Sequence, residues 1–250
     1  MLEFLQMLHW GAVFQIIMID ILLGGDNAVV IALACRNLEQ KQRMRGILWG
    51  TAGAIFLRVV LIAFALTLLN IPFLKLVGGL LLIWIGVKLL VPETEGHGNI
   101  ASGTTVWNAI KTIIIADFVM SLDNVIAIAA AANNTHADHQ IYYVIFGLVV
   151  SVPIIIWGST LVLRLIDRFP VVVMLGAGLL GWIAGGMLIN DPVVVGQLAH
   201  VANGAWVEPA PAGGPASAIG SVKLISEVVG ALLVVLIGRS IAKKKGVVKG

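Results

Sequence analysis

The stretch Asp20-Ile21-Leu22-Leu23-Gly24-Gly25-Asp26-Asn27 lies inside an apolar run and is followed by the apolar residues 28–34. It recurs as Asp117-Phe118-Val119-Met120-Ser121-Leu122-Asp123-Asn124, which again precedes an apolar run. One charged side chain at mid-membrane costs roughly 2.5–3.5 kcal/mol, so four carboxylates would cost on the order of 10 kcal/mol by simple addition. A cost of this size requires a reason, and we expect the two segments to build one cation site.

The composition predicts a polytopic membrane protein. Of 250 residues 59% are apolar and only 12% are charged, and the mean hydropathy is +1.02. Several runs of about 20 apolar residues match the thickness of a hydrocarbon core. The net charge of +3 does not indicate a nucleic-acid partner, because the basic residues gather at membrane edges. The single cysteine, Cys35, excludes an intramolecular disulfide framework and a cysteine-cluster metal site.

Seven apolar spans can be drawn along the chain. They are too long and continuous for barrel strands, so they are predicted to be helices, since only helices and closed barrels satisfy the backbone in lipid. The first span has no Lys or Arg before it and no cleavage signature, which predicts a retained helix. The expected fold is an all-α polytopic membrane protein whose spans are Trp10–Cys35, Ile47–Leu69, Phe73–Leu90, Trp107–Ala132, Ile141–Leu163, Val171–Ile189 and Ser221–Gly238.

The basic residues predict the orientation. They flank alternate connections, and the remaining connections are nearly free of basic charge. The positive-inside rule then places the N-terminus outside and the C-terminus in the cytoplasm. The expected location is the cell inner (plasma) membrane. The residues that carry this prediction are Arg36, Lys41, Arg43, Arg45, Lys88, Lys111, Arg164, Arg168, Arg239, Lys243, Lys244, Lys245 and Lys249.

Two copies of a three-helix repeat are expected. Asp20, Asp26 and Asn27 align with Asp117, Asp123 and Asn124 at an offset of 97 residues, and six of fifteen positions are identical over 20–34. With a slip of one residue, Pro72, Gly78 and Trp84 align with Pro170, Gly176 and Trp182. Each copy has an odd number of spans, so the copies are inverted, as in many secondary transporters. The first and fourth spans should meet at the repeat interface.

We expect one transmembrane domain, residues 1–250. A connection of linker composition, rich in Pro, Gly and Ala around 208–215, should form a flexible external loop. The predicted parts are a first repeat at 10–90, an inverted second repeat at 107–190, the external loop at 191–220, a seventh helix at 221–240 and a basic cytoplasmic tail at 241–250.

The candidate ligands are carboxylates and amides. Residues seven apart share a helix face, whereas residues six apart diverge by roughly 120°. Asp20 therefore shares a face with Asn27, and Asp26 lies off that face unless the helix is distorted. The pair Gly24-Gly25 predicts a helix break or a close helix contact. The metal-binding candidates are Asp20, Asp26, Asn27, Asp117, Asp123 and Asn124, and the candidates for accessory roles are Gly24, Gly25, Ser121, Arg58 and Glu227.

An all-oxygen ligand set favours Mg²⁺, Ca²⁺ or Mn²⁺ over Cu⁺ and Zn²⁺. The ion would be a transported substrate, and no cofactor is expected. Four carboxylates exceed what one divalent ion needs. Arg58 could neutralise one of them, and protonation could neutralise others, which makes proton exchange a hypothesis. The alternative reading is structural: buried Asp and Asn can hold helices together, Arg58 can form a structural salt bridge, and Glu227 can pair with Lys223.

The doubled motif, Asp-x5-Asp-Asn-Ala-Val-Val-Ile-Ala at 20–32 and Asp-x5-Asp-Asn-Val-Ile-Ala at 117–127, resembles the TerC family of integral membrane proteins. The resemblance covers roughly residues 10–190 and is nearest to the shorter bacterial, YjbE-like branch. It implies metal homeostasis, notably manganese efflux, with both copies of the Asp, Asp and Asn triplet as metal-binding positions. The family link, and not the sequence pattern itself, favours Mn²⁺ among the hard cations.

The acidic residues also allow function classes other than metal export. Paired intramembrane Asp residues occur in aspartyl proteases, but Leu23 breaks the Gly-x-Gly-Asp signature, so no enzyme is expected. An exporter of a cationic amino acid or another amine remains an alternative, because the same carboxylates could bind an amine. A non-transporting metal sensor or scaffold is a third alternative. The oligomeric state is not predicted by the sequence.

Overall fold

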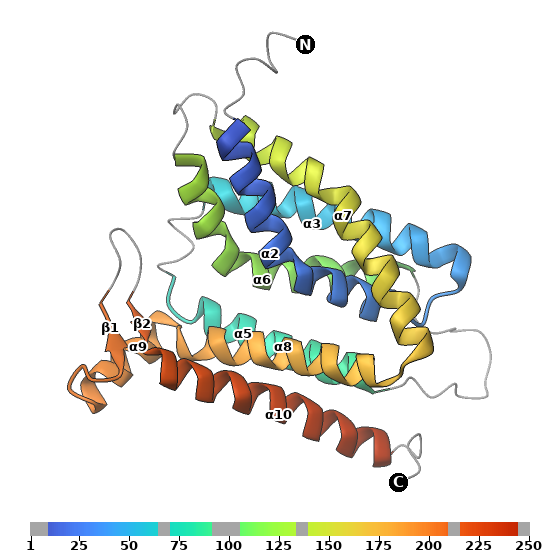
Figure 1. Cartoon of the computed structure of the whole chain (residues 1–250). Coiled ribbons are helices and arrows are strands. Elements are labelled where there is room, and N and C mark those ends of the chain that lie inside the picture. The colour runs from blue at the N-terminus through green and yellow to red at the C-terminus, as the bar shows by residue number, and fades with distance from the viewer. Residues whose placement is uncertain (1–9, 65–70, 92–105, 134–139, 210–215, 245–250) are drawn as a thin grey trace. The chain divides into compact units, whose positions relative to one another are not determined.

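The computed structural model describes residues 10–64, 71–91, 106–133, 140–209 and 216–244. Side chains of residues 10–13, 15–16, 19–24, 62–63 and 123–149 lie outside this description. Most of the described chain is helical, as Figure 1 shows.

The helices follow the predicted spans closely. Trp10–Cys35 and Val171–Ile189 match their predictions residue for residue, and the other five predicted spans each coincide with a helix within the described residues. The elements are α2 (Trp10–Cys35), α3 (Gln40–Ala63), α5 (Leu74–Leu90), α6 (Val106–Asn133), α7 (Gln140–Arg168), α8 (Val171–Ile189), α9 (Pro192–Val201), β1 (Val207–Glu208), β2 (Ser217–Ala218) and α10 (Gly220–Lys244).

The apolar helices identify a multi-pass membrane protein. A helix needs about 20 mainly apolar residues to cross the hydrocarbon core. In the described ranges, segments of sufficient length and hydropathy occur at Gln40–Leu61, Val150–Arg168, Val171–Ile189 and Gly220–Lys244.

The chain divides into two compact units. Unit 1 comprises residues 1–65 and 106–164 and holds α2, α3, α6 and most of α7. Unit 2 comprises residues 66–105 and 165–250 and holds α5, α8, α9, α10 and the two strands. The first two helices of each predicted repeat thus lie in unit 1, whereas the third helix of each lies in unit 2.

In unit 1, α3 and α6 pack closely and run in the same direction. A Cβ built on Gly50 would lie 2.5 Å from Cδ1 of Ile113, and one on Gly46 would lie 4.0 Å from Cβ of Ala109. Residue numbers rise together along the two helices, so they are parallel. Small residues allow helix backbones to approach in a membrane, where lipid provides no hydrophobic force between helices.

The connection between α2 and α3 is short and held by Arg43. Its guanidinium donates to the carbonyl oxygens of Leu38 at 3.1 Å and Arg36 at 2.8 Å. These bonds satisfy carbonyl oxygens of the turn that follows α2, where regular helical partners are absent. The sulfur of Cys35 lies 3.0 Å from the Cβ position of Gly46, which brings the end of α2 against the start of α3.

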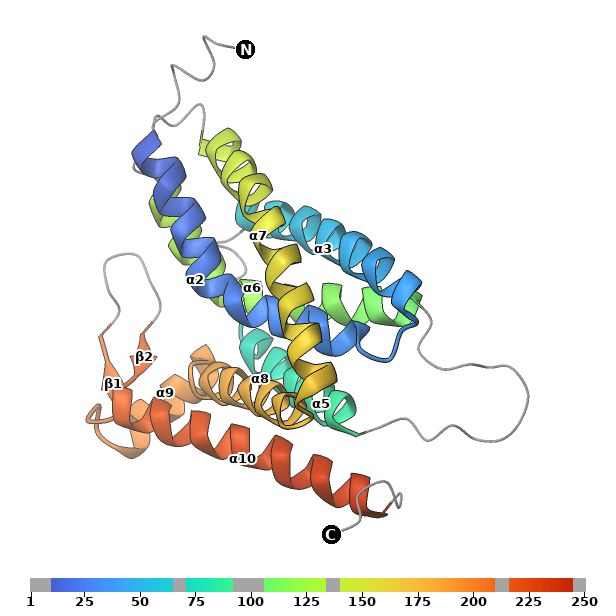
Figure 2. The same ribbon diagram turned by 45° about the vertical axis from the view of Figure 1, so that its right-hand side comes forward.

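The predicted break at Gly24-Gly25 is wrong, because α2 is helical through both residues. Gly25 is exposed, and among the described residues no atom lies within 4 Å of its Cβ position, so no close helix contact is found there. Two glycines weaken helix propensity by only about 2 kcal/mol together, whereas an unwound turn in lipid would leave several backbone groups unsatisfied. Figures 1 and 2 show that α2 and α6 instead change direction part-way while remaining coiled.

In unit 2, the backbones of α8 and α10 are in direct contact. A Cβ on Gly181 would overlap the carbonyl oxygen of Gly230, and one on Gly185 would overlap the carbonyl oxygen of Ser226. The Ser226 hydroxyl also donates to the carbonyl of Gly185 at 2.8 Å. The pairs run in opposite sequence directions, so the helices are antiparallel. Each contributes small residues four apart, the spacing that lets membrane helices approach closely.

Helix α5 completes this group by packing on both α8 and α10. Gly79 lies against Ala184, and Gly86 lies against Ala177, so α5 and α8 are antiparallel. Gly86 also meets Val234 of α10, and Gly238 of α10 meets Leu90, so α5 and α10 are parallel.

The connection 191–220, predicted to be a flexible loop, contains ordered structure, so this prediction needs correction. Helix α9 occupies Pro192–Val201, and β1 pairs with β2 in a two-stranded antiparallel sheet in which Val207 faces Ala218. The amide of Ala218 donates to Oδ1 of Asn190 at the end of α8. Residues 210–215, the centre of the linker-like composition, lie outside the described residues.

Asp191 organises this connection. Its side chain is fully buried and accepts hydrogen bonds from the amides of Phe73 at 3.3 Å, Leu76 at 3.1 Å and Val193 at 3.0 Å. One carboxylate therefore caps the first turns of both α5 and α9, whose unpaired N–H groups favour a negative charge.

We predict that Gly181→Ala lowers the melting temperature of the detergent-purified protein, because its new Cβ would collide with backbone. Overpacking of this kind typically costs about 1–3 kcal/mol. Gly196→Ala in α9 is the matched control, since nothing lies within 4 Å of that Cβ position. It should be neutral or stabilising through better helix propensity. Equal melting temperatures for the two variants would contradict the backbone contact.

We also predict that Asp191→Ala destabilises the α5–α9 junction, because three backbone donors lose their shared acceptor. Loss of a helix cap costs about 0.5–2 kcal/mol, and two helices lose one here. Limited proteolysis should show faster cleavage within 191–220 in this variant than in Glu208→Ala, an exposed site in the same connection. Identical digestion rates would show that the caps do not hold the segment.

Candidate cation site

The polar centre of unit 1 is an ion pair between α3 and α6. Arg58 and Asp117 are 3% and 6% exposed, and a terminal guanidinium nitrogen lies 2.5 Å from Oδ1 of Asp117. Arg58 Nε donates to the Ser121 hydroxyl at 3.2 Å, and that hydroxyl donates to Asp117 Oδ2 at 3.2 Å. The three side chains form a closed triangle in which charge and hydrogen bonding are matched, as burial of charges requires.

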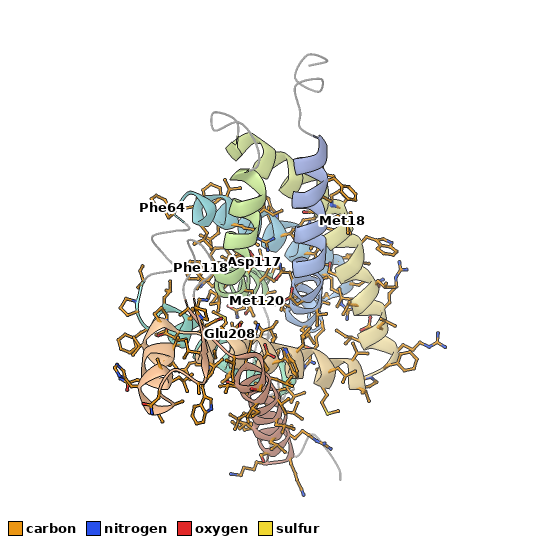
Figure 3. The ribbon with its side chains drawn as sticks, turned by 60° about the vertical axis from the view of Figure 1, so that its left-hand side comes forward. Met18, Phe64, Asp117, Phe118, Met120 and Glu208 are labelled. Carbon is orange, nitrogen blue, oxygen red and sulfur yellow. The ribbon has the colours of Figure 1, made fainter. Side chains whose placement is uncertain are left out.

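Helix geometry explains why these residues meet. Asp117 and Ser121 are four residues apart and share a face of α6. Arg58 lies on the buried face of α3, which consists of Ile47, Thr51, Ala54, Arg58 and Leu61. The parallel packing of α3 on α6 carries Arg58 to the level of Asp117. In Figure 3, Asp117 lies among the helices of unit 1, whereas Phe64 and Met18 lie at its edge.

Helix α2 adds Asp26 and Asn27. Oδ1 of Asp26 accepts a hydrogen bond from the backbone amide of Asn27 at 2.9 Å. Asp26 also lies within electrostatic range of Arg58 and Asp117. The structure therefore brings Asp26 and Asp117, one residue from each motif copy, into one region with the Arg58 charge beside them.

The side chain of Asn27 is the exception to the matched bonding of this region. It is 4% exposed, and in the part of the chain that the structure describes neither its Oδ1 nor its Nδ2 has a hydrogen-bond partner. A buried amide without partners costs about 1–3 kcal/mol. Such a group requires an explanation, and an ion or ordered water is among the standard ones.

Several predicted residues fall outside the described side chains: Asp20, Gly24, Asp123 and Asn124. Their helical backbone is described, since they lie in α2 and α6. Among the side chains that are described, no three His, Cys, Asp or Glu residues come together as a metal-binding group. The full ligand set therefore stays a prediction.

Glu227 lies in unit 2, against α8. Its Oε1 is 3.0 Å from the Cβ position of Gly186 and 3.8 Å from Nζ of Lys223. The contact with Gly186 agrees with the structural alternative, in which Glu227 packs against a helix and pairs with Lys223. Its role in an ion path remains a prediction.

Thr51 was missed by the sequence analysis. Its hydroxyl is buried, and no partner for it occurs in the described ranges. Thr51 lies seven residues before Arg58 and therefore on the same face of α3. A single threonine in an apolar helix carries no sequence signal, so only the packing identifies it.

Comparison with known proteins decides the family. The model of the Integral membrane protein TerC family matches residues 5–246. The chain belongs to this family. The resemblance carried by the doubled acidic motif is thereby confirmed, and its extent is larger than the predicted 10–190. The family match includes α9, the strands and α10, so these are part of the family's architecture.

The relatives are membrane proteins that carry no functional name. The chain is 47% identical to the uncharacterized membrane protein YjbE of Bacillus subtilis over 70% of this chain and 78% of that protein. This agrees with the YjbE-like branch. It is 24% identical to YceF of the same species over 64% of each chain. It is 28% identical to the inner membrane protein YgdQ of Escherichia coli over 68% of this chain and 77% of the relative. No solved structure matches.

We predict that Asn27→Leu raises the melting temperature of this TerC family protein when it is prepared in chelator. Leucine has similar branching and removes the buried polar atoms, which relieves a desolvation cost of about 1–3 kcal/mol. Asn190→Leu is the control. The Asn190 amide donates to Gly186 and accepts from Ala218, so the same change should lower the melting temperature. A lower value for Asn27→Leu would show that its amide is satisfied.

Proposed function

We propose that this protein exports a divalent metal cation, most favourably Mn²⁺, across the plasma membrane. The ion would pass a site at the middle of the membrane where the two acidic motif copies meet. The observation that carries this proposal is the unpartnered amide of Asn27, which is buried next to Asp26 and within the electrostatic field of Arg58 and Asp117. Hard cations take carboxylate, amide and hydroxyl oxygens as ligands.

The proposed architecture is seven spans in two inverted repeats. The helix directions support it. Alternating spans would make α3 parallel to α6, α5 antiparallel to α8 and parallel to α10, and these are the directions observed within each unit. Direct packing of α5 on α8 is also expected, since a two-fold axis brings equivalent helices together.

The proposed orientation has the N-terminus outside and the basic C-terminus in the cytoplasm. The basic residues at the ends of α5, α7 and α10 support it, because they would all lie on one side. The inner membrane description of the Escherichia coli relative agrees with a plasma-membrane location.

We predict that purified protein in liposomes takes up Mn²⁺ and that Asp26→Asn reduces the initial rate by about tenfold or more. Loss of a charge next to a divalent ion at an effective dielectric near 20 is worth at least 1.4 kcal/mol, or about tenfold. Asp167→Asn, at an exposed position near the end of α7, is the matched control and should transport normally.

Robust Mn²⁺ flux in an Asp26→Asn/Asp123→Asn variant would contradict the assignment of these carboxylates. Lysine added as a competitor tests the amine alternative, since inhibition would indicate that the site binds an ammonium group. Proton coupling needs its own measurement with a pH-sensitive dye inside the liposomes. Mn²⁺ flux that moves no protons and ignores a pH gradient would exclude exchange.

A further inference from the structure

We infer that Asp117 is not an ion ligand. It forms with Arg58 a neutral pair that sets the charge of the site, and the cation is held by the α2 motif together with groups other than Asp117. This inference rests on the proposed function and departs from the symmetrical ligand set that the repeat predicts. In this inference the copy of the motif in α2 binds the ion, whereas Asp117 of the copy in α6 pairs with Arg58.

The first argument is the bonding of the Asp117 carboxylate. Oδ1 accepts a hydrogen bond from the guanidinium of Arg58, and Oδ2 accepts one from the hydroxyl of Ser121. Ser121 in turn accepts from Arg58, so the three groups hold one another in place. Both carboxylate oxygens therefore already have donors inside the protein, in a region from which water is excluded.

The second argument is the permanence of the Arg58 charge. A guanidinium stays protonated at any physiological pH, so it cannot vacate the carboxylate by losing a proton. A divalent cation bound to Asp117 would stand beside this positive charge. Such repulsion is strong where solvent screening is weak. A cation coordinated from α2 would avoid direct contact with the guanidinium.

The third argument is the asymmetry of the repeat. Asp117 corresponds to Asp20, and Ser121 corresponds to Gly24. The counterpart of Arg58 is Ile155 or Ile156, depending on where the one-residue slip falls, and both are isoleucine. The basic residue and the hydroxyl that hold Asp117 are thus encoded in only one copy.

The fourth argument is the contrasting state of α2. Asp26 is partly exposed and its Oδ1 accepts from the backbone of Asn27, while the amide of Asn27 has no partner in the described structure. Unused buried ligand atoms are therefore found on α2, whereas those of the Asp117 triangle are in use.

The test is a double-mutant cycle read by Mn²⁺ titration of the full-length protein in nanodiscs. Arg58→Met uncovers an anion and removes a cation near the site, so it should tighten binding by about tenfold or more. Asp117→Leu leaves a buried unpaired cation and should weaken binding by a similar factor. A pair with a purely structural role would not shift binding in opposite directions.

The variant Arg58→Met/Asp117→Leu should bind Mn²⁺ within about threefold of wild type, because replacing a buried ion pair by apolar side chains is often tolerated. The controls are Asp26→Leu and Asp26→Leu/Arg58→Met. Both should bind Mn²⁺ more weakly than wild type, because each lacks the Asp26 carboxylate.

A double variant that loses Mn²⁺ as Asp26→Leu does would overturn the inference. If the single variants do not yield monodisperse protein, the test uses Mn²⁺ binding by the double variant and by its milder form Arg58→Gln/Asp117→Asn. Both should bind Mn²⁺ as wild type does. Failure of the proposed function has a different signature, since wild-type protein would then bind no divalent cation.

Discussion

Hydrocarbon offers no hydrogen-bond partners, so each polar group that enters the membrane must be satisfied inside the protein. The helices satisfy the backbone, and the described polar side chains gather between them. Arg58, Asp117 and Ser121 form hydrogen bonds with one another, and Asp191 accepts hydrogen bonds from backbone amides at the starts of two helices. The amide of Asn27 differs, because it is buried and has no hydrogen-bond partner in the described structure. The buried hydroxyl of Thr51 is a second polar group without a partner in the described residues, but only Asn27 belongs to the acidic motif.

Helix association in lipid also depends on close contact, because apolar side chains are as well solvated by lipid as by protein. Glycines accordingly lie at the helix–helix contacts. Gly181, Gly185 and Gly230 bring the backbones of α8 and α10 together, and Gly50 and Gly53 seat isoleucines of α6 on α3. In unit 2, small residues thus hold α5, α8 and α10 in close contact. Unit 1 holds the Arg58–Asp117 ion pair together with Asp26, and its helix α2 changes direction part-way along (Figure 2). The two units differ in both packing and chemistry.

The sequence was sufficient for features that depend on local composition. Hydropathy predicted both ends of α2 and α8, although α3, α7 and α10 extend beyond their predicted spans, and the family followed from one repeated motif. The sequence was insufficient where the local structure depends on contacts with residues that are distant in the chain. Asp191 orders the 191–220 connection by accepting from Phe73 and Leu76, more than a hundred residues earlier, which no local pattern encodes. The glycine pair at 24–25 suggested a break, but the backbone requirement of lipid outweighs a weak propensity. Asp117 looked equivalent to Asp20 until packing placed Arg58 beside it.

The asymmetry of the site has a physical rationale. If two identical acidic motifs faced each other, four carboxylates would repel one another and would bind a divalent ion too tightly to release it. One internal cation removes one negative charge permanently. Because arginine stays protonated at any physiological pH, the charge of the Arg58–Asp117 pair does not change with pH. A lysine would be less suitable, since burial lowers its pKa and would make the charge of the site depend on pH. In the proposed inverted-repeat architecture, Arg58 would therefore set the charge of the site from one copy of the repeat alone.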